Sequence, residues 1–578
     1  MNTQIYDLLN AMTEHKYTSQ RDLSAVTGYS LGMVNQSLGC LVEEGYLTRS
    51  YQLTEKAEKE AEQKKPENAI ILAAGFGLRM VPINREIPKG LVEVKGEPLI
   101  ERQIRQLHEV GIRDITVVVG FMKEAYEYLI DDYGVKLLVN QEYATKNNLH
   151  SLFLAKDRIS NTYIIPCDIW CSENPFSRRE WYSWYMVTEI IKDDSFVRVN
   201  RKKELAAVER GKSGNEMIGI SYVLETDAEL LRKNLQEMED QKAGSHAFWE
   251  EACMQKGKML LASRLVSSQK VFEINTYEDL READEDSRQL KSEVLNTIAG
   301  ALGSSTTEMR EIRMLKKGMT NRSFQFCCRE KEYIMRIPGE GTDQLIDRKQ
   351  ECQVYQEVAD LGLSDTVCYF EPEKGYKLTE FIPGTRVCNS RDREDVLRCM
   401  TVLRKFHESG KKVSHTFDLF EKIDFYESLW RDTPSCYKDY GRTKEKIGEL
   451  KRYLEEQPKR WTLCHIDSVP DNFLITDREI RLIDWEYAGM QDADVDIAMF
   501  AVYALYERDQ VDDLIDAYYM EGCPKNVRRK IYAYIAVCGL LWSNWCEYKH
   551  HLGVEFGEYS LRQYRYAKEY YKIWKEET

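Results

Sequence analysis

A short apolar run that ends in closely spaced glycines constrains this chain most. Residues 69–74 read AIILAA, and Gly75-Phe76-Gly77 follow at once. The run has the length and composition of a strand buried on both faces, as in a parallel sheet. Glycines directly after such a strand let the backbone approach a ligand and turn its N–H groups toward phosphate. The stretch predicts an α/β domain with a phosphate-binding loop, although a plain glycine turn would leave the same pattern.

Two cations near these glycines suit a nucleoside triphosphate. Arg79 lies just beyond Gly77, and Lys89 follows Pro88 further along. The loop is neither of the two common phosphate loops, because it lacks the Gly-Lys-Ser/Thr ending of a P-loop and the third glycine of a dinucleotide fingerprint. Arg79 and Lys89 are therefore the expected cations of a different kind of triphosphate site.

The segment around this loop alternates apolar strand candidates with amphipathic helix candidates. Strands are expected over 69–74, 115–120, 136–139 and 163–166, and helices over 99–110 and 123–133. Such βαβ order predicts a mainly parallel, Rossmann-like sheet with ligands at the C-terminal strand ends. The last of these strands closes on Asp168, a carboxylate suited to Mg²⁺ carried by a triphosphate. The alternative is a surface aspartate that caps a turn.

Length and composition limit the classes of protein. A chain of 578 residues exceeds one core, and roughly three or four domains are expected. The net charge of −15 argues against a general nucleic-acid binder. The absence of a long apolar run or signal peptide argues against a membrane protein. Fifteen cysteines without a CxxC pair are typical of reduced thiols, so a cytoplasmic location is expected. A homo-oligomer is left open.

Residues 1–65 resemble a winged helix-turn-helix module. Ser19 caps one helix candidate, a turn at Gly28 precedes a second, and residues 45–54 suit a wing. DNA binding would be the usual role of such a module. However, residues 30–45, the presumptive recognition helix, contain no Lys or Arg, and acidic residues outnumber basic ones in the module. Phosphate attraction needs cations, so an interaction or dimerisation role is favoured.

Residues 291–578 carry a second set of catalytic residues. His465-Ile466-Asp467 precedes Asn472, and the apolar run Leu482-Ile483 closes on Asp484-Trp485-Glu486. In kinases, an aspartate base orients the acceptor hydroxyl, while an asparagine and a second aspartate hold Mg²⁺ on ATP. Asp467 is the expected base, and Asn472 and Asp484 are the expected metal ligands. Chance acidic turns are the alternative, but both motifs occur in the order that kinases require.

Three residues upstream of these motifs complete a bilobal kinase pattern. Arg336 lies in a strand candidate, Glu351 lies on the following helix, and Glu380 belongs to the 378–383 segment expected to connect two lobes. All three are expected to serve ATP binding. Arg336 stands where a lysine is usual, and arginine and lysine are not interchangeable toward phosphate, so ATP affinity could be altered.

Tryptophans beside acidic residues occur in both the central and the C-terminal segments. Trp542 and Trp545 lie three residues apart, on one helix face, and Trp485 adjoins Glu486. In the central segment, Trp249 and Glu273 have similar character. Aromatic faces and carboxylates are groups that attract organic cations. A core aromatic stripe is the alternative in both segments.

Taken together, the central motifs resemble the sugar-nucleotidyltransferase family. LAAGFGLR with Pro88-Lys89 matches the family's NTP loop, and residues 67–285 are most similar to the bacterial CTP:phosphocholine cytidylyltransferases of the Lic type. The resemblance implies metal binding by Asp168 and Asn275, although many relatives have Asp where this chain has Asn275. It also implies nucleotide contacts from the following residues: Ala73, Ala74, Gly75, Gly77, Asn148 and Ser151.

The C-terminal motifs resemble choline kinases and aminoglycoside phosphotransferases. Over most of residues 305–575 the likeness is to the bacterial Lic-type choline kinase, which matches His465-Ile-Asp467, Ile483-Asp-Trp-Glu486 and Leu541-Trp-Ser-Asn-Trp545. The resemblance implies that Asp467 is the catalytic base, that Asn472 and Asp484 bind Mg²⁺, and that Trp542 and Trp545 form a trimethylammonium cage with Glu486. A unit that binds without turnover is a weaker alternative.

These expectations describe a multidomain α/β and α+β chain. The expected parts are a winged-helix module at 1–65, a Rossmann-like nucleotidyltransferase domain at 66–290 and a bilobal protein-kinase-like domain at 291–578. The kinase would convert choline and ATP to phosphocholine, and the central domain would convert phosphocholine and CTP to CDP-choline. One alternative keeps both chemistries for ethanolamine or another amino alcohol. Another is a DNA-binding regulator with sensor domains, which two intact catalytic sets argue against.

Overall fold

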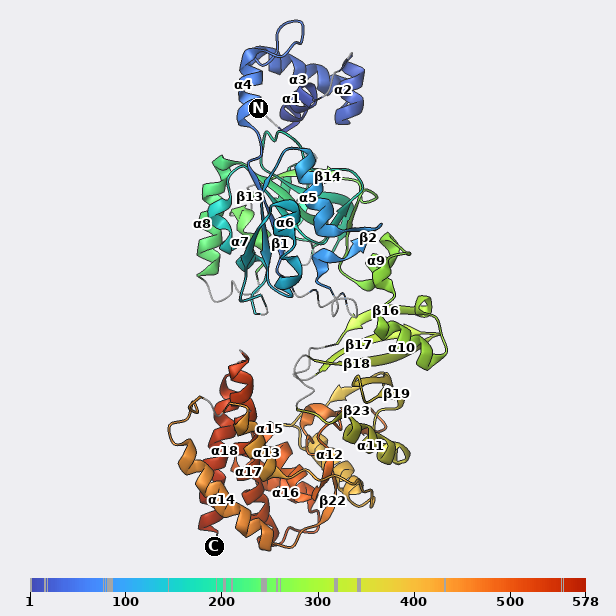
Figure 1. The fold of residues 1–578 in the computed structure, drawn as a ribbon, viewed down its shortest axis with the longest axis vertical. Helices are drawn as coiled ribbons and strands as arrows, with labels where there is room; N and C mark the ends of the chain where they lie inside the picture. Colours follow the sequence, from blue (N-terminus) through green and yellow to red (C-terminus); the bar gives the residue numbers. More distant parts are fainter. Residues whose placement is uncertain are drawn as a thin grey trace. The chain divides into compact units, whose positions relative to one another are not determined.

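The computed structural model divides into two compact units (Figure 1). The first comprises Met1–Ala299 and Arg310–Met314, and the second comprises Gly300–Met309 and Leu315–Thr578. The structure describes residues 3–577 except 15–16, 18, 76, 78–79, 81–86, 144, 194, 201–203, 209–211, 241–246, 256–257, 260, 316–320, 340–344, 431–432, 553 and 555. No helix among the described residues is long and apolar enough to cross a bilayer.

The first unit begins with a small helical module. Its helices are α1 (Thr3–Glu14), α2 (Gln20–Thr27), α3 (Leu31–Glu43) and α4 (Glu55–Gln63). Ser19 caps α2 in a reciprocal capping box with Asp22, and Ser30 caps α3. Buried leucines from α1, α2 and α3 form the module's core, which Trp181 of the following domain joins. Leu47 and Leu53 form an isolated antiparallel bridge.

A seven-stranded sheet forms the centre of the domain that follows in the first unit. Its order is β14-β8-β11-β6-β1-β4-β5. The strands are β1 (Asn68–Ala73), β4 (Asp114–Val119), β5 (Lys136–Val139), β6 (Thr162–Pro166), β8 (Trp184–Lys192), β11 (Gly214–Val223) and β14 (Ala262–Val266). β1 pairs in parallel with β4 and β6, whereas β11 runs antiparallel to β6 and β8. The Rossmann-like α/β expectation is therefore confirmed for this domain.

Helices cover both faces of this sheet. Successive β1 residues point to opposite faces, so Ile71 packs with α5 (Leu99–Glu109) and α6 (Leu129–Tyr133), whereas Ile70 packs with α7 (Asn148–Leu154) and α8 (Glu225–Glu239). Both faces of β1 are buried, which explains why residues 69–74 read as a continuous apolar run.

The second unit has a sheet followed by a mainly helical part (Figure 1). Antiparallel strands β17 (Asn321–Cys328), β18 (Lys331–Pro338), β20 (Tyr376–Glu380) and β19 (Val367–Glu371) are neighbours in that order, and α11 (Arg348–Val358) lies between β18 and β19 in the chain. The helical part contains α12 (Arg393–His407), α13 (Leu419–Ser428), α14 (Tyr440–Glu456), α15 (Asp494–Tyr503), α16 (Arg508–Tyr518), α17 (Lys525–His551) and α18 (Glu558–Glu576). This arrangement agrees with the expected kinase-like architecture.

Four short strands of the helical part frame the catalytic motifs. β22 (Trp461–Cys464) pairs with β25 (Gly489–Asp492), and β23 (Phe473–Ile475) pairs with β24 (Ile480–Leu482). The His465–Asp467 motif leaves β22, and the Asp484–Glu486 motif leaves β24. The two strand pairs therefore fix the starting points of both motifs.

Candidate active sites

In the first unit, a short strand pairing brings together Asp168 and Asn275, the two predicted metal ligands. β7 (Ile169–Cys171) pairs antiparallel with β15 (Val271–Glu273), and the backbone N–H of Ile274 donates to the Asp168 carbonyl over 2.9 Å. Lys89 forms an ion pair with Asp168 and donates from Nζ to Asn275 Oδ1 over 2.7 Å. The structure thus brings together Lys89, Asp168 and Asn275.

These residues have the chemistry of a divalent metal site. Asp168 Oδ2 and Asn275 Oδ1 converge on one cation, the Lys89 ammonium, while the buried Asp168 Oδ1 has no hydrogen-bond partner among the described residues. A buried carboxylate oxygen without a partner is costly unless a ligand completes its coordination. Carboxylate and amide oxygens are the donors that Mg²⁺ prefers.

The glycine loop passes beside Lys89. Gly77 has a left-handed φ of 59°, and a Cβ there would lie 3.5 Å from Lys89 Cβ. Ala73 ends β1 and Ala74 is buried, while a Cβ on Gly75 would meet no heavy atom of the described residues within 4 Å. Arg79, the second expected cation, lies outside the described residues.

The predicted nucleotide contacts of α7 have roles within the fold. Asn147 caps the helix, Asn148 Oδ1 accepts the Trp249 backbone N–H over 3.0 Å, and Ser151 Oγ accepts from Asn140 Nδ2 over 3.0 Å. Ser151 is buried, and Asn148 is partly exposed. The Asn148 amide oxygen thus fixes the start of the segment that carries Trp249.

Trp249 and Glu273, the two predicted choline contacts of this domain, differ in exposure. Trp249 is fully buried against Tyr185, with ring centroids 6.0 Å apart, whereas Glu273 is exposed. Tyr185 also donates its hydroxyl to Glu250 over 3.2 Å. Burial raises the pKa of Glu250 to about 7, and the Glu273 carboxylate contributes to the same shift. Trp249 therefore presents no surface to a ligand in this conformation.

In the second unit, the catalytic loop is held by a buried carboxylate. Asp496 on α15 accepts the backbone N–H groups of His465 and Ile466 over 2.8 and 2.7 Å. Ile466 has a φ of 67°, a strained value for a β-branched residue. Asn472 Nδ2 donates to Asp467 Oδ2 over 3.0 Å. These contacts fix the direction of the Asp467 side chain.

Asp484 lies in a second strained turn beside this loop. Its φ is 67°, and the preceding Ile483 donates its backbone N–H to the Asn472 carbonyl over 3.0 Å. His465 Nε2 lies 3.0 Å from the Ile483 carbonyl oxygen. Asp467, Asn472 and Asp484 thus belong to one hydrogen-bonded assembly.

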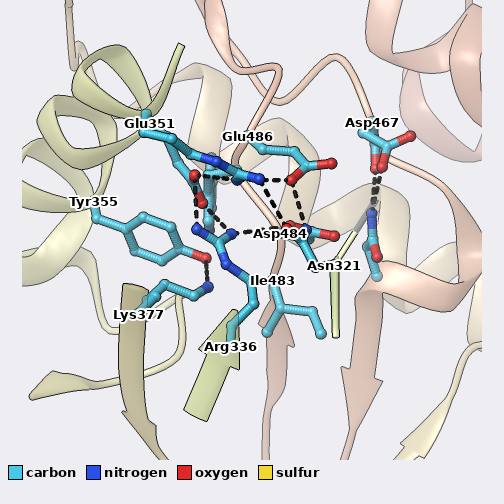
Figure 2. Close-up of polar contacts among 12 residues, drawn as sticks. Asn321, Arg336, Glu351, Tyr355, Lys377, Asp467, Ile483, Asp484 and Glu486 are labelled. Carbon is cyan, nitrogen blue, oxygen red and sulfur yellow. Dashed lines mark hydrogen bonds and ion pairs between the residues drawn. The ribbon is translucent and has the colours of Figure 1, made fainter. Parts of the chain in front are cut away.

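A buried network links Arg336 to the acidic motif (Figure 2). Arg336 pairs with Glu351 through both guanidinium nitrogens and lies 3.7 Å from Asp484. Arg348 donates to Glu351 over 2.9 Å and to Glu486 over 3.2 Å. The two arginines overcome the penalty that burial imposes on the Glu351 carboxylate and hold its pKa at about 2.

Sequence reasoning missed several members of this network. Arg348 also donates to Asn321 Oδ1 over 2.8 Å, and Asn321 Nδ2 donates to Glu486 over 2.8 Å. Lys377 lies opposite Arg336 on the neighbouring strand and contacts Tyr355 (Figure 2). The spacing of three between Arg348 and Glu351 was the available signal, because such residues share a helix face.

One pocket of about 390 Å³ joins these residues to the predicted aromatic cage. Predicted site residues on its wall are Arg336, Glu380, Asp467, Asn472, Asp484, Glu486, Trp542 and Trp545. Trp542 and Trp545 meet edge to face with centroids 5.8 Å apart, and Tyr487 packs against Trp542 at 6.0 Å. Trp485 does not line the pocket: it is fully buried, and its indole N–H donates to the Leu482 carbonyl over 2.9 Å.

The pKa of Asp467 in this pocket is suited to proton transfer. The pKa of Asp467 is raised to about 7, mainly by burial and also by the nearby Glu486 carboxylate. A general base is most effective when its pKa lies near the working pH.

Comparison with known proteins supports both halves of the chain. A family model described as choline/ethanolamine kinase matches residues 312–560, and one described as a MobA-like NTP transferase domain matches residues 69–184. A choline-phosphate cytidylyltransferase from Streptococcus pneumoniae is 32% identical over 222 residues, which is 38% of this chain and 96% of the relative. A 2-aminoethylphosphonate cytidylyltransferase from Lancefieldella rimae is 32% identical over 225 residues, or 38% of this chain and 92% of the relative.

The C-terminal half has its own relatives. Protein LicA from Haemophilus influenzae is 26% identical over 258 residues, which is 42% of this chain and 96% of that protein. The predicted resemblance is therefore confirmed in both halves, and both matched domains belong to transferases. The chain belongs to the choline-phosphate cytidylyltransferase family and continues into a choline/ethanolamine kinase domain, as a fusion of Lic type.

Proposed function

We propose that this chain makes CDP-choline in two steps. The second unit phosphorylates choline with ATP, and the first unit transfers a cytidylyl group from CTP to the phosphocholine, releasing pyrophosphate. The observation that carries the proposal is the kinase pocket, in which Asp467 shares one wall with Trp542 and Trp545. A kinase base beside an aromatic pair suits an acceptor that carries both a hydroxyl and a quaternary ammonium.

In the kinase step, Asp467 orients the choline hydroxyl and accepts its proton as the oxygen attacks the γ-phosphorus of ATP. The Asn472 hydrogen bond holds the Asp467 carboxylate in place. Asn472 and Asp484 would hold Mg²⁺, which supplies charge neutralisation for the phosphates. Glu486 and the indole faces of Trp542 and Trp545 hold the trimethylammonium group.

In the cytidylyl step, a phosphate oxygen of phosphocholine attacks the α-phosphorus of CTP. This oxygen is already ionised, so no side-chain base is required. Lys89 and Arg79 stabilise the charge that develops on the phosphates. Asp168 and Asn275 would hold Mg²⁺, which adds to that neutralisation.

The acceptor of the first unit is inferred mainly from the second unit. Cytidylyltransferases with two different acceptors are equally similar to it in identity. The kinase domain makes phosphocholine the favoured acceptor, because one unit then produces the substrate of the other. Phosphoethanolamine is the second candidate, since the matched kinase model covers both alcohols.

The domain limits follow the same proposal. Residues 1–65 form the helical module, 66–290 the cytidylyltransferase and 291–578 the kinase. The helical module serves protein contacts, since α3 contains no Lys or Arg to attract DNA phosphates. The catalytic reactions need no membrane.

A coupled assay tests the proposal directly. The full chain is incubated with choline, ATP, CTP and Mg²⁺, and the products are separated by chromatography. CDP-choline, ADP and pyrophosphate are expected, and omission of ATP should abolish CDP-choline unless phosphocholine is supplied. Turnover of ethanolamine without turnover of choline would refute the choline assignment.

A further inference from the structure

The Lys89 ammonium lies at the point where the Asp168 and Asn275 oxygens converge. It forms an ion pair with Asp168 Oδ2 and donates to Asn275 Oδ1 over 2.7 Å. The Lys89 and Asp168 side chains are only 14% and 13% exposed, so water screens their attraction weakly. Two of the oxygens that a divalent metal would use, Asp168 Oδ2 and Asn275 Oδ1, are therefore already bound to a cation of this chain, and Asp168 Oδ1 shares its carboxylate with one of them.

The charges of the site make lysine and metal competitors. Because residue 275 is Asn, Asp168 is the one anionic side chain of the three, and Lys89 neutralises it. A dication would add two positive charges to a site whose negative charge is already balanced. Coulomb repulsion at direct contact, in a poorly hydrated place, opposes that addition strongly. The metal can enter only if the ammonium leaves.

We infer that Lys89 closes the metal site of the first unit until CTP arrives, so that the divalent cation and the nucleotide enter together. The triphosphate gives the ammonium a new anionic partner, and Asp168 and Asn275 then turn to the metal. This inference rests on the proposed cytidylyltransferase function and adds an order of binding to it. By linkage, the metal strengthens CTP binding as much as CTP strengthens metal binding.

The local backbone confines the movement to the lysine side chain. The N–H of Leu91 donates to the Pro88 carbonyl over 2.9 Å, which closes the 3₁₀ turn Lys89–Leu91. A Cβ on Gly90 would approach Tyr126 Oη to 3.0 Å, so the turn packs closely on its surroundings. The flexible stem of Lys89 therefore supplies the motion, and the Cα position stays in place.

The kinase unit provides a contrast. Arg336 also lies near a predicted metal ligand, 3.7 Å from Asp484, but both of its terminal nitrogens pair with Glu351. The Arg336 charge is thus balanced by a carboxylate that is not a metal ligand. Arg336 also lies farther from Asp484 than Lys89 lies from its two partners, so direct competition between a side-chain cation and a metal is expected at Lys89.

Mn²⁺ binding without nucleotide tests the inference. Free Mn²⁺ is followed by electron paramagnetic resonance during titration of the full chain. Mn²⁺ binding at the kinase site is expected to be the same in all variants, so differences between variants report on the first unit. Lys89→Met should bind an additional Mn²⁺ at least tenfold more tightly than the wild type, although it makes no CDP-choline. Adding Asp168→Asn to Lys89→Met should abolish the gain, which locates the new site.

Two substitutions separate charge from packing. Lys89→Arg keeps a cation and should bind Mn²⁺ as weakly as the wild type. Lys136→Met removes another lysine paired with an aspartate, Asp114 at 2.7 Å, on the surface of the same sheet, and should change nothing. An unchanged or weaker Mn²⁺ affinity in Lys89→Met overturns the inference.

A second variant covers a Lys89→Met chain that fails to fold. Asn275→Asp adds a negative charge beside Lys89 and should also permit Mn²⁺ binding without CTP. Failure of the proposed function is seen separately, as a wild-type chain that makes no CDP-choline from CTP and supplied phosphocholine. A wild type that makes CDP-choline, with no gain of Mn²⁺ binding in either variant, refutes the lysine inference alone.

Discussion

At the scale of single residues, Arg348 lies between two carboxylates from different parts of the kinase site. Its guanidinium serves Glu351 and Glu486 and also donates to Asn321. A lysine presents a single ammonium and cannot reproduce this planar set of contacts. Arg348→Lys should therefore fold but lower kcat/KM for phosphorylation by about tenfold to a hundredfold, in line with a lost charge-assisted contact of about 1.5–3 kcal/mol.

Removing the charge at residue 348 should affect stability as well. Arg348→Gln leaves two buried carboxylates under-compensated, and a loss of about 3 kcal/mol is expected from urea unfolding of the kinase. Arg481→Gln is the matched control, because Arg481 pairs with Glu479 at the surface and should cost about 0.5 kcal/mol. Equal stability of the two variants would refute a structural role for the Arg348 network.

The buried Glu250 predicts that the stability of the first unit depends on pH. Burial raises its pKa to about 7 from an ordinary value of 4.5, so the folded state retains the proton to higher pH than the unfolded state does. Stability is therefore lost as pH rises from about 4.5 to about 7, where ionisation of the buried group becomes costly. Glu250→Gln should raise the unfolding free energy by about 1–3 kcal/mol at about pH 8 and change it little at about pH 4.5.

Unfolding followed by tryptophan fluorescence at both pH values measures this effect. Glu229→Gln on α8 is the control, because Glu229 is exposed. A Glu250→Gln gain that is the same at both pH values would contradict ionisation as its cause.

At the scale of elements, the contact between α17 and α18 supports the aromatic pocket. A Cβ on Gly539 of α17 would come within 2.7 Å of the Gln563 carbonyl oxygen on α18. Gly539→Ala should therefore destabilise the kinase by about 1–3 kcal/mol, the usual cost of overpacking, and raise KM for choline because Trp542 lies on the same helix.

A second helical glycine gives the matched control for this prediction. Gly448 of α14 is exposed and has open space around its Cα. Gly448→Ala should stabilise by up to about 1 kcal/mol, because alanine favours the helix. Thermal unfolding of the two variants in opposite directions is the expected result, and stabilisation in both would rule out close packing at Gly539.

Elements were predictable where the pattern was local. The apolar run 69–74 coincides closely with β1, and Ser19 caps α2 as expected. The expected helix over 123–133 is instead a 3₁₀ turn, Lys123–Tyr126, followed by the short α6, which Gly134 ends with a φ of 70°. Amphipathic spacing does not reveal such interruptions, because an apolar side chain of each part is buried as it would be in one continuous helix.

At the scale of the whole molecule, the two active sites belong to separate compact units. Asp467→Ala should abolish phosphocholine formation and leave cytidylyl transfer from supplied phosphocholine intact. Lys89→Met should do the reverse. A mixture of the two variants should therefore make CDP-choline from choline, ATP and CTP, after a lag while free phosphocholine accumulates.

The time course of the two products by chromatography measures this complementation. A mixture of wild-type chain and Lys89→Met is the control, since it needs no exchange between chains. Loss of both activities in Asp467→Ala would contradict independent sites, and failure of the mixture would show that phosphocholine is not exchanged between chains.

Local motifs were enough to identify both chemistries in this chain. The strand-to-glycine run, His465-Ile-Asp467 and Ile483-Asp-Trp-Glu486 each lie within a few residues, and their backbone geometry follows from neighbouring residues. Contacts over long separations required the fold. Lys89 meets Asp168 and Asn275 across 79 and 186 residues, and Arg348 meets Glu486 across 138.

The sequence by itself determined the α/β and kinase-like classes and the chemical types of residue in each site. Only the tertiary structure decided which charged side chains pair, namely Lys89 with Asp168 and Arg348 with two glutamates. It also decided that Trp249 and Trp485 lie inside the core. The physical reason is that burial and charge pairing depend on distances between elements, and these distances are set by packing.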